Sequence, residues 1–77
     1  MTVTVYSKPA CPQCDFTKKH LDTLGVPHTV VDVTTDYTAL DRVRAMGYSS
    51  LPVVVVGDDH WSGFRPARLD MLVSRVA

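Results

Sequence analysis

Two cysteines, three residues apart, are the side chains of this sequence best suited to chemistry. Cys11 and Cys14 flank Pro12 and Gln13, and the chain has no other cysteine. Residues i and i+3 of a helix lie about 5 to 6 Å apart, close enough for a disulfide with little backbone movement. A loop of about four residues removes only about 2 kcal/mol of unfolded-state entropy, which is little for a structural crosslink. The spacing therefore predicts a thiol pair that can form and open a disulfide.

The segments on either side of this pair predict a strand followed by a helix. Residues 2–6 alternate threonine or tyrosine with valine, a period-two pattern typical of a strand. From Pro12 onward, one helix face carries Cys14, Thr17, Leu21 and Leu24. Gly25 predicts the end of that helix, because glycine readily adopts the left-handed backbone of a C-terminal cap. The cysteines should therefore lie at a strand-to-helix turn.

The middle of the chain predicts further strands and one helix. Residues 29–33 indicate a second strand, parallel to the first, because a strand–helix–strand unit of this length implies a right-handed crossover. Thr35 or Asp36 can cap a second helix, which Gly47 ends. Residues 51–56 predict a third strand buried on both faces. A turn at residues 57–59 leads into a short fourth strand at residues 60–63, forming a hairpin.

The final helix and the order of the elements indicate the fold class. Pro66 suits the first position of a helix, whose apolar side consists of Leu69, Leu72, Val73 and Val76. The order βαβαββα predicts an α/β fold with a four-stranded mixed sheet flanked by three helices. This pattern resembles the minimal, glutaredoxin-like thioredoxin fold over essentially the whole chain. A length of 77 residues favours one compact domain, residues 1–77.

Composition argues against several classes of partner. Eight basic side chains balance eight acidic ones, all aspartate, and such neutrality disfavours a general nucleic-acid or membrane-surface interaction. The longest aliphatic run, residues 51–56, is far shorter than the roughly 20 residues of a membrane helix. We expect a cytoplasmic monomer without a membrane or nucleic-acid partner. In a reducing compartment, paired cysteines are usually catalytic, redox-sensing or metal-binding.

The predicted helix assigns different roles to the two thiols. Cys11 would lie at the helix cap, where unpaired backbone N–H groups and the helix dipole favour an anion. Lys8 adds a positive charge nearby, and such surroundings lower the pKa of a thiol. Cys14 would lie on the apolar face, partly covered. We therefore expect Cys11 to attack and Cys14 to resolve the mixed disulfide.

A metal site is the main chemical alternative, because zinc sites often begin with Cys-x-x-Cys. Only His20, His28 and His60 remain as conventional additional ligands. His20 would lie roughly 9 Å along the helix and about 120° around it from Cys14, too far to share a metal. The other two histidines are predicted at the opposite end of the sheet. The same separation argues against a Cys–His hydrolase, whereas a metal or iron–sulfur module that bridges two chains stays open.

A second distinctive segment occupies residues 61–66, after the predicted fourth strand. Its aromatic residues could fill the core or contact a partner. Together with Cys-x-Gln-Cys, the run Trp61-Ser62-Gly63-Phe64-Arg65-Pro66 resembles the NrdH-redoxin family of glutaredoxin-like proteins. The resemblance implies a thiol–disulfide oxidoreductase that supplies electrons to the large subunit of class Ib ribonucleotide reductase. It also implies reduction by NADPH through thioredoxin reductase, with a redox-active disulfide and no bound cofactor.

These interpretations define the candidate site. Cys11 and Cys14 are the catalytic pair; the supporting residues are Lys8, Pro12, Gln13 and Pro52, and no metal ligands are assigned. The expected partner-binding residues are Leu51, Trp61, Ser62, Gly63, Phe64 and Arg65. In thioredoxin-like proteins the proline matching Pro52 is cis and faces the disulfide, which leaves the preceding backbone free to pair with an incoming chain.

Departures from the family pattern affect the choice of partner more than the thiol chemistry. Ala67 stands where many relatives carry an acidic residue, and Leu51 precedes the proline. A glutathione-dependent glutaredoxin is the alternative function. Glutaredoxins commonly have tyrosine at the position of Gln13 and an acidic pair after the fourth strand, and this chain has neither, which disfavours glutathione. The arginines at positions 42, 44, 65 and 68 could guide an acidic tail of a partner, but they are interpreted as a solvated charged face.

Overall fold

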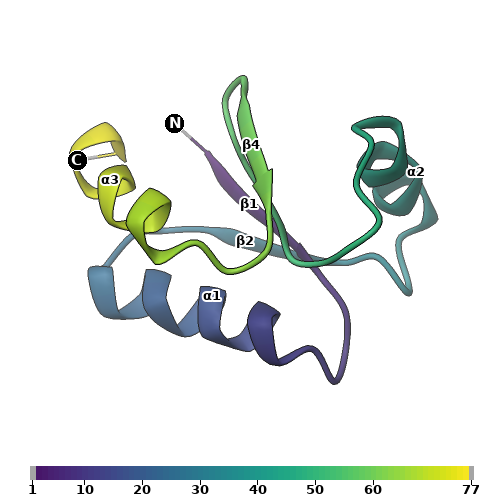
Figure 1. Cartoon of the computed structure of the whole chain (residues 1–77), viewed down its shortest axis with the longest axis horizontal. Coiled ribbons are helices and arrows are strands. Elements are labelled where there is room, and N and C mark those ends of the chain that lie inside the picture. The colour runs from purple at the N-terminus through teal and green to yellow at the C-terminus, as the bar shows by residue number, and fades with distance from the viewer. Residues whose placement is uncertain (1, 77) are drawn as a thin grey trace.

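The computed structural model describes residues 2–76, with side chains described through residue 75. Strands and helices follow one another in the predicted order (Figure 1). They are β1 (Val3–Ser7), α1 (Pro12–Leu24), β2 (Thr29–Asp32), α2 (Tyr37–Ala45), β3 (Val53–Val56), β4 (Asp59–Ser62) and α3 (Pro66–Val76). None of the three described helices has the length and apolar character to traverse a bilayer.

The four strands form one mixed sheet in the order β2-β1-β3-β4. β1 runs parallel to β2 and antiparallel to β3, and β3 pairs antiparallel with β4. The parallel pair requires a crossover connection, which α1 provides. The predicted fold class, a minimal thioredoxin fold with three helices around a mixed sheet, is confirmed.

Alternation along the strands sends side chains into two separate clusters, one on each face of the sheet. Val3 and Val5 of β1 belong to the cluster beneath α1 and α3, together with Leu21, Leu69 and Leu72. Tyr6, the next residue of β1, belongs to the other cluster. That second cluster contains Ala39 and Val43 of α2, the helix that lies apart from α1 and α3 in Figure 1. The sheet is therefore covered on both faces, as predicted.

The helix ends confirm two predictions of local structure. Gly25 caps α1 with a left-handed φ of 70°. Asp36, rather than Thr35, is the N-cap of α2: its carboxylate accepts a hydrogen bond from the Ala39 N–H at 3.0 Å. Thr35 instead donates its hydroxyl to the Asp32 carbonyl at 3.2 Å.

The element boundaries differ from the predictions by one or two residues. β3 begins at Val53, because Pro52 has no N–H to donate to the strand ladder. β4 begins at Asp59, which pairs with Val56 across the turn. In α3, Val73 was expected on the apolar side, but 42% of it is exposed, whereas Leu69 and Leu72 are buried. At 100° per residue, Val73 lies about 70° from the direction midway between those leucines. The side chain of Val76 lies outside the described residues.

Candidate redox site

The reactive centre is a disulfide between Cys11 and Cys14 at the N-terminus of α1. Cys11 is the N-cap, with an extended backbone, and Pro12 occupies the first helical position. The two Cα atoms lie 5.2 Å apart, inside the normal range for a disulfide. The disulfide predicted from the spacing is therefore present. It lies at the turn between β1 and α1, as the sequence indicates.

The sulfur of Cys11 lies where the backbone favours negative charge. Its Sγ accepts a hydrogen bond from the Cys14 backbone N–H at 3.2 Å. This donor is one of the N–H groups at the start of a helix that have no partner within the helix. The carbonyl oxygen of Leu51 lies 3.9 Å from the same sulfur, so a reduced thiol there would have an acceptor nearby. The helix dipole and the Cys14 N–H together stabilise a thiolate at Cys11 once the disulfide opens.

The two cysteines differ in solvent exposure. The difference is small, because Cys11 is itself largely buried although it caps the helix. Cys11 is 6% exposed, whereas Cys14 is completely buried. Cys14 lies on the same face of α1 as the buried Thr17 and Leu21. A partner can therefore reach only a small part of Cys11, and Cys14 is open to attack only from within the site.

Pro52 lies beside the disulfide, as the family resemblance implied. The Leu51–Pro52 peptide bond is cis, and the proline ring is fully buried. The carbonyl of Pro52 accepts a hydrogen bond from the Gly63 N–H at 2.8 Å. The start of β3 and the loop after β4 are thereby joined next to the cysteine pair.

Gln13 makes a second link to that loop, one that sequence reasoning missed. Its Oε1 accepts a hydrogen bond from the Phe64 backbone N–H at 3.1 Å. Gly63 has a φ of 87°, and a Cβ built there would lie 3.4 Å from the same oxygen. The loop therefore packs closely on the cysteine motif. The only signal available in the sequence was that Gln13 and the segment 61–66 together carried the family resemblance.

Trp61 requires a correction, because it was expected to contact a partner. Its side chain is 4% exposed and belongs to the core cluster beneath α1 and α3. The Arg68 guanidinium lies 5.2 Å from the centre of its ring. Of the two alternatives for this aromatic residue, core packing is the correct one. His60 and Ser62, both more exposed, alternate with Trp61 along β4, a pattern that already indicated an inward side chain.

The other loop residues are placed at the surface or hold the loop together. Ser62 donates its hydroxyl to the Ser50 carbonyl at 2.9 Å. Arg65, which is exposed, donates its Nε–H to the Ser62 carbonyl at 3.1 Å. Their contacts within the chain explain the shape of the loop.

Phe64 belongs to a small aromatic cluster on the outside of α1. Its ring centre lies 5.9 Å from that of Phe16 and 5.9 Å from that of His20. Phe16 is 56% exposed, and His20 contacts Asp70 of α3 at 2.7 Å. Phe16 was not among the residues predicted at the site, although a phenylalanine on the polar side of a helix, two residues after the cysteine pair, was a signal.

The three histidines each bond to a group away from the disulfide. His20 contacts Asp70, His28 bonds to the Val26 carbonyl, and His60 bonds to the Tyr48 hydroxyl. Within residues 2–76, no three His, Cys, Asp or Glu side chains come together in a group able to hold a metal ion.

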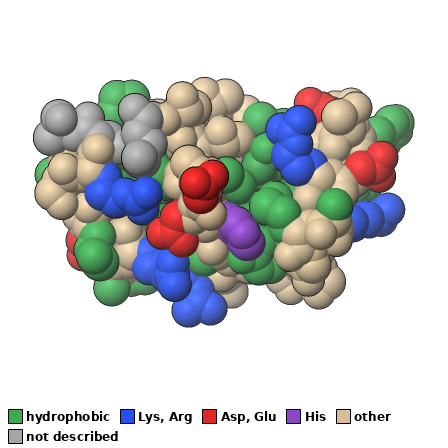
Figure 2. Space-filling view, turned by 90° about the horizontal axis from the view of Figure 1, so that it is seen from above, with side chains coloured by type: hydrophobic (Ala, Val, Ile, Leu, Met, Phe, Trp, Pro, Cys, Tyr) green, Lys and Arg blue, Asp and Glu red, His purple; other side chains and the backbone are tan. Residues whose placement is uncertain are grey.

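Lys8 and Leu51 line an open hollow of about 380 Å³ beside Cys11, together with Pro12 and Gln13. The hollow brings together five of the residues expected at the site and leaves the buried Trp61 outside it. Over the face of the molecule drawn in Figure 2, basic and acidic side chains are intermixed.

Asp32 at the end of β2 and Arg42 of α2 have shifted pKa values. The Thr34 hydroxyl and backbone N–H both donate to Asp32 and hold the pKa of its carboxyl below the usual value. The Tyr6 hydroxyl accepts a hydrogen bond from Arg42 at 3.2 Å and raises the pKa of that guanidinium. Arg42 therefore stays charged at any physiological pH.

Comparison with known proteins places this geometry in a family. Residues 3–61 match the family model for glutaredoxin. The glutaredoxin-like protein NrdH of Salmonella typhimurium is 40% identical over 72 residues, which cover 94% of this chain and 89% of the relative. NrdH of Lactococcus lactis subsp. cremoris is 36% identical over 91% of this chain and 97% of its own length. The solved structure of NrdH-redoxin from Escherichia coli superposes with a TM-score of 0.91 at 38% identity, over 94% of this chain and 95% of that one. With its cysteine pair, cis-proline and overall fold, this chain belongs to the NrdH group of the glutaredoxin family.

Proposed function

We propose that this protein is a dithiol–disulfide oxidoreductase that carries electrons from thioredoxin reductase to the large subunit of a class Ib ribonucleotide reductase. The observation that carries the proposal is the Cys11–Cys14 disulfide at the start of α1, next to the cis-proline Pro52. The E. coli relative, 38% identical, is described as a glutaredoxin-like protein with a thioredoxin-like activity profile. That description supports thioredoxin reductase as the electron source.

In the proposed reaction, the Cys11 thiolate attacks one sulfur of the client disulfide. A Cys11–client disulfide forms, and the client's second sulfur leaves as a thiolate that takes up a proton. Cys14 then loses its proton and attacks the Cys11 sulfur, which releases the first client thiol and forms the Cys11–Cys14 disulfide. Two electrons and two protons have passed to the client. Thioredoxin reductase, using NADPH, restores the dithiol.

The chain's own groups support each step. The Cys14 N–H bonds to the Cys11 sulfur and lowers the free energy of the thiolate that attacks the client disulfide. Burial keeps Cys14 away from competing disulfides. The backbone at Leu51, beside the Cys11 sulfur, is proposed to pair with the incoming chain as a short added strand.

Two hydrogen bonds in the loop after β4 favour thioredoxin reductase over glutathione. Glutathione is a small charged peptide, and a site must fix it with a few polar groups. The N–H groups of Gly63 and Phe64 already bond to the Pro52 carbonyl and the Gln13 amide oxygen. Neither donor is free for a peptide carboxylate, and no acidic pair follows β4 to hold an amino group.

The electrons travel through thiols, so the proposed reaction needs no bound cofactor. The NADPH-dependent reductant leads us to propose the cytoplasm as the site of action. We propose that the protein acts as a monomer, since its whole cycle uses one cysteine pair.

A coupled assay tests the proposal directly. NADPH oxidation is followed with class Ib ribonucleotide reductase as the acceptor, using either thioredoxin reductase or glutathione reductase plus glutathione. We expect faster turnover with thioredoxin reductase. Equal or faster turnover with glutathione would assign the chain to the glutathione-dependent glutaredoxins. Stoichiometric zinc or iron in anaerobically purified protein would instead support a metal-binding module.

A further inference from the structure

Arg44 differs from the other arginines that the sequence placed on a charged face. Three of them bond within the chain: Arg42 to Tyr6, Arg65 to Ser62 and Arg68 to Asp59. Within residues 2–76, the Arg44 guanidinium has neither an ion pair nor a side-chain hydrogen bond. It projects from the last turn of α2, where the helix dipole favours a cation. Arg44 is therefore available to a partner.

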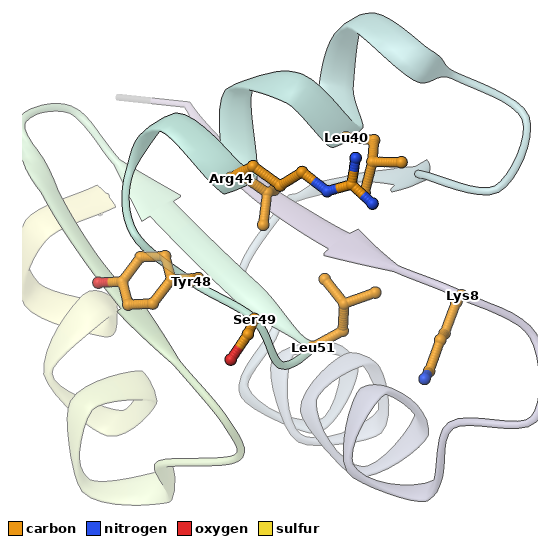
Figure 3. Close-up of a pocket in the computed structure, with 7 residues that line it drawn as sticks. Lys8, Leu40, Arg44, Tyr48, Ser49 and Leu51 are labelled. Carbon is orange, nitrogen blue, oxygen red and sulfur yellow. The ribbon is translucent and has the colours of Figure 1, made fainter.

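Arg44 and Lys8 line the same hollow, of about 280 Å³. In Figure 3, Arg44 comes from α2 and Lys8 from the segment after β1, with the apolar side chains of Leu40 and Leu51 beside them. Lys8, like Arg44, makes no ion pair within the described part of the chain. The hollow thus combines an apolar floor with two unpaired cations.

This hollow continues into the one beside the disulfide. Lys8, Ser49 and Leu51 line both, and the second also includes Cys11. We call the combined feature the Lys8–Arg44 groove, defined by Cys11, Lys8, Leu51, Leu40 and Arg44. No aspartate lines either part. In a chain with a net charge of zero, the groove carries a local excess of positive charge that leads to the reactive sulfur.

We propose that the Lys8–Arg44 groove binds an extended segment of the protein whose disulfide is reduced, and that this segment carries an aspartate or glutamate close to the cysteine attacked by Cys11. The inference rests on the proposed disulfide chemistry. An aliphatic side chain of the segment packs on Leu40 and Leu51, while the carboxylate lies between the two cations. Because opposite charges across an interface raise the association rate and fix the register, the groove selects clients by sequence as well as by redox potential.

Synthetic disulfide peptides test the inference without a reductase. Peptides with an internal disulfide carry a run of glutamates on the N-terminal or the C-terminal side of the cysteines, and matched peptides carry glutamines instead. The protein is first reduced with dithiothreitol and separated from it, and chromatography then follows the release of peptide thiols. We expect the glutamate form to react about two- to fivefold faster for each contacting cation in at least one arrangement. The preference should shrink as salt rises from about 0.05 M to 0.5 M.

Arg44→Gln is the decisive variant, because Arg44 does not line the hollow beside the disulfide. It should reduce the preference for glutamate about two- to fivefold while leaving the rate with the glutamine peptides and the alkylation of Cys11 unchanged. Lys8→Gln should also reduce the preference, although its position beside the disulfide makes it a less specific test. Lys19→Gln is the charge-matched control: Lys19 is exposed on α1 and lines neither hollow, so this variant should keep the wild-type preference.

The outcomes separate the groove from the proposed function. Equal rates for glutamate and glutamine peptides in both arrangements would overturn the groove inference, as would a preference that Arg44→Gln leaves intact. Loss of the preference on adding an excess of S-methylglutathione, which cannot exchange disulfides, would identify a small tripeptide as the occupant and also overturn it. Failure to reduce any peptide would contradict the proposed dithiol chemistry instead.

Discussion

The two sulfurs of the disulfide occupy unequal surroundings, although they lie in a single turn of chain. Cys11 accepts the Cys14 N–H at 3.2 Å and retains a slightly exposed edge. Cys14 has no exposed surface. A thiolate reacts faster than a thiol, so the backbone contact and the difference in access both support the proposal that Cys11 is the attacking residue.

Single serine substitutions should reveal this asymmetry. Cys14→Ser should leave a protein that forms a stable mixed disulfide with its client, because the resolving thiol is missing. Cys11→Ser should form none. Non-reducing gels and mass spectrometry of protein mixed with oxidised client measure the adduct. Faster alkylation of Cys14 than of Cys11 in the reduced protein at neutral pH would reverse the assignment.

Gln13 is the residue most directly tied to the loop after β4. Gln13→Ala should remove the acceptor of the Phe64 N–H and lower the free energy of unfolding by about 0.5 to 1.5 kcal/mol. Amide hydrogen exchange at Phe64 should become faster. Gln13→Glu, which places a carboxylate oxygen where the amide oxygen accepted the bond, is the matched control and should retain the protection. Unchanged exchange in Gln13→Ala would show that the bond does not hold the loop in solution.

At the scale of the elements, local sequence patterns predicted the strands, most helix ends and the place of the disulfide. Alternation identified β1, a continuous aliphatic run identified β3, Gly25 marked the end of α1, and Asp36 was one of two candidates for the α2 cap. These features depend on a few neighbouring residues, which is why a single sequence reveals them. The disulfide was predicted from the same local information, because two cysteines three residues apart at the start of a helix lie close enough to bond.

The contacts that complete the site could not be predicted in this way. The bond between Gln13 and Phe64 joins residues 51 positions apart, and no local pattern indicates which backbone N–H a glutamine will meet. Val73 lies at the edge of the buried side, rather than within it, because the packing direction of α3 is set by Leu69 and Leu72 against the sheet. The availability of Arg44 likewise emerges only when the partners of its neighbours are known.

The connection between β2 and α2 contains a turn in which a carboxyl group titrates. Asp32 has a lowered pKa because it accepts hydrogen bonds from the Thr34 hydroxyl and N–H. A carboxyl whose pKa is lower in the folded state stabilises the fold above its unfolded pKa, about 3.9, and loses that contribution as the pH falls through the folded pKa.

Asp32→Asn removes this titration but keeps an oxygen that can accept a hydrogen bond. The wild type should therefore be more stable than the variant above about pH 5, and the difference should shrink as the pH falls below about 4. Chemical unfolding at a series of pH values measures it. A difference that stays constant down to about pH 2 would show that the ionised Asp32 does not contribute.

At the scale of the whole molecule, the two clusters on the faces of the sheet carry the stability of a small protein. Trp61 belongs to the larger cluster, so Trp61→Ala should lower the free energy of unfolding by about 3 to 5 kcal/mol. That is a large part of the roughly 5 to 15 kcal/mol typical of a domain. Urea unfolding followed by circular dichroism checks this. If Trp61→Ala instead has wild-type stability but binds its partner more weakly, Trp61 belongs to the partner interface and not to the core.

The direction of the first strand and the last helix has one more consequence. β1 runs toward Cys11, and α3 runs away from the loop that meets the cysteine motif. Figure 1 accordingly shows the start of β1 and the end of α3 close together, far from the first turn of α1. The molecule can therefore be tethered at either end, to a bead, an electrode or a second module, with its disulfide still facing outward. A short flexible tether to a client would then raise the local concentration of dithiol to the millimolar range, so that a weak encounter becomes an efficient intramolecular exchange.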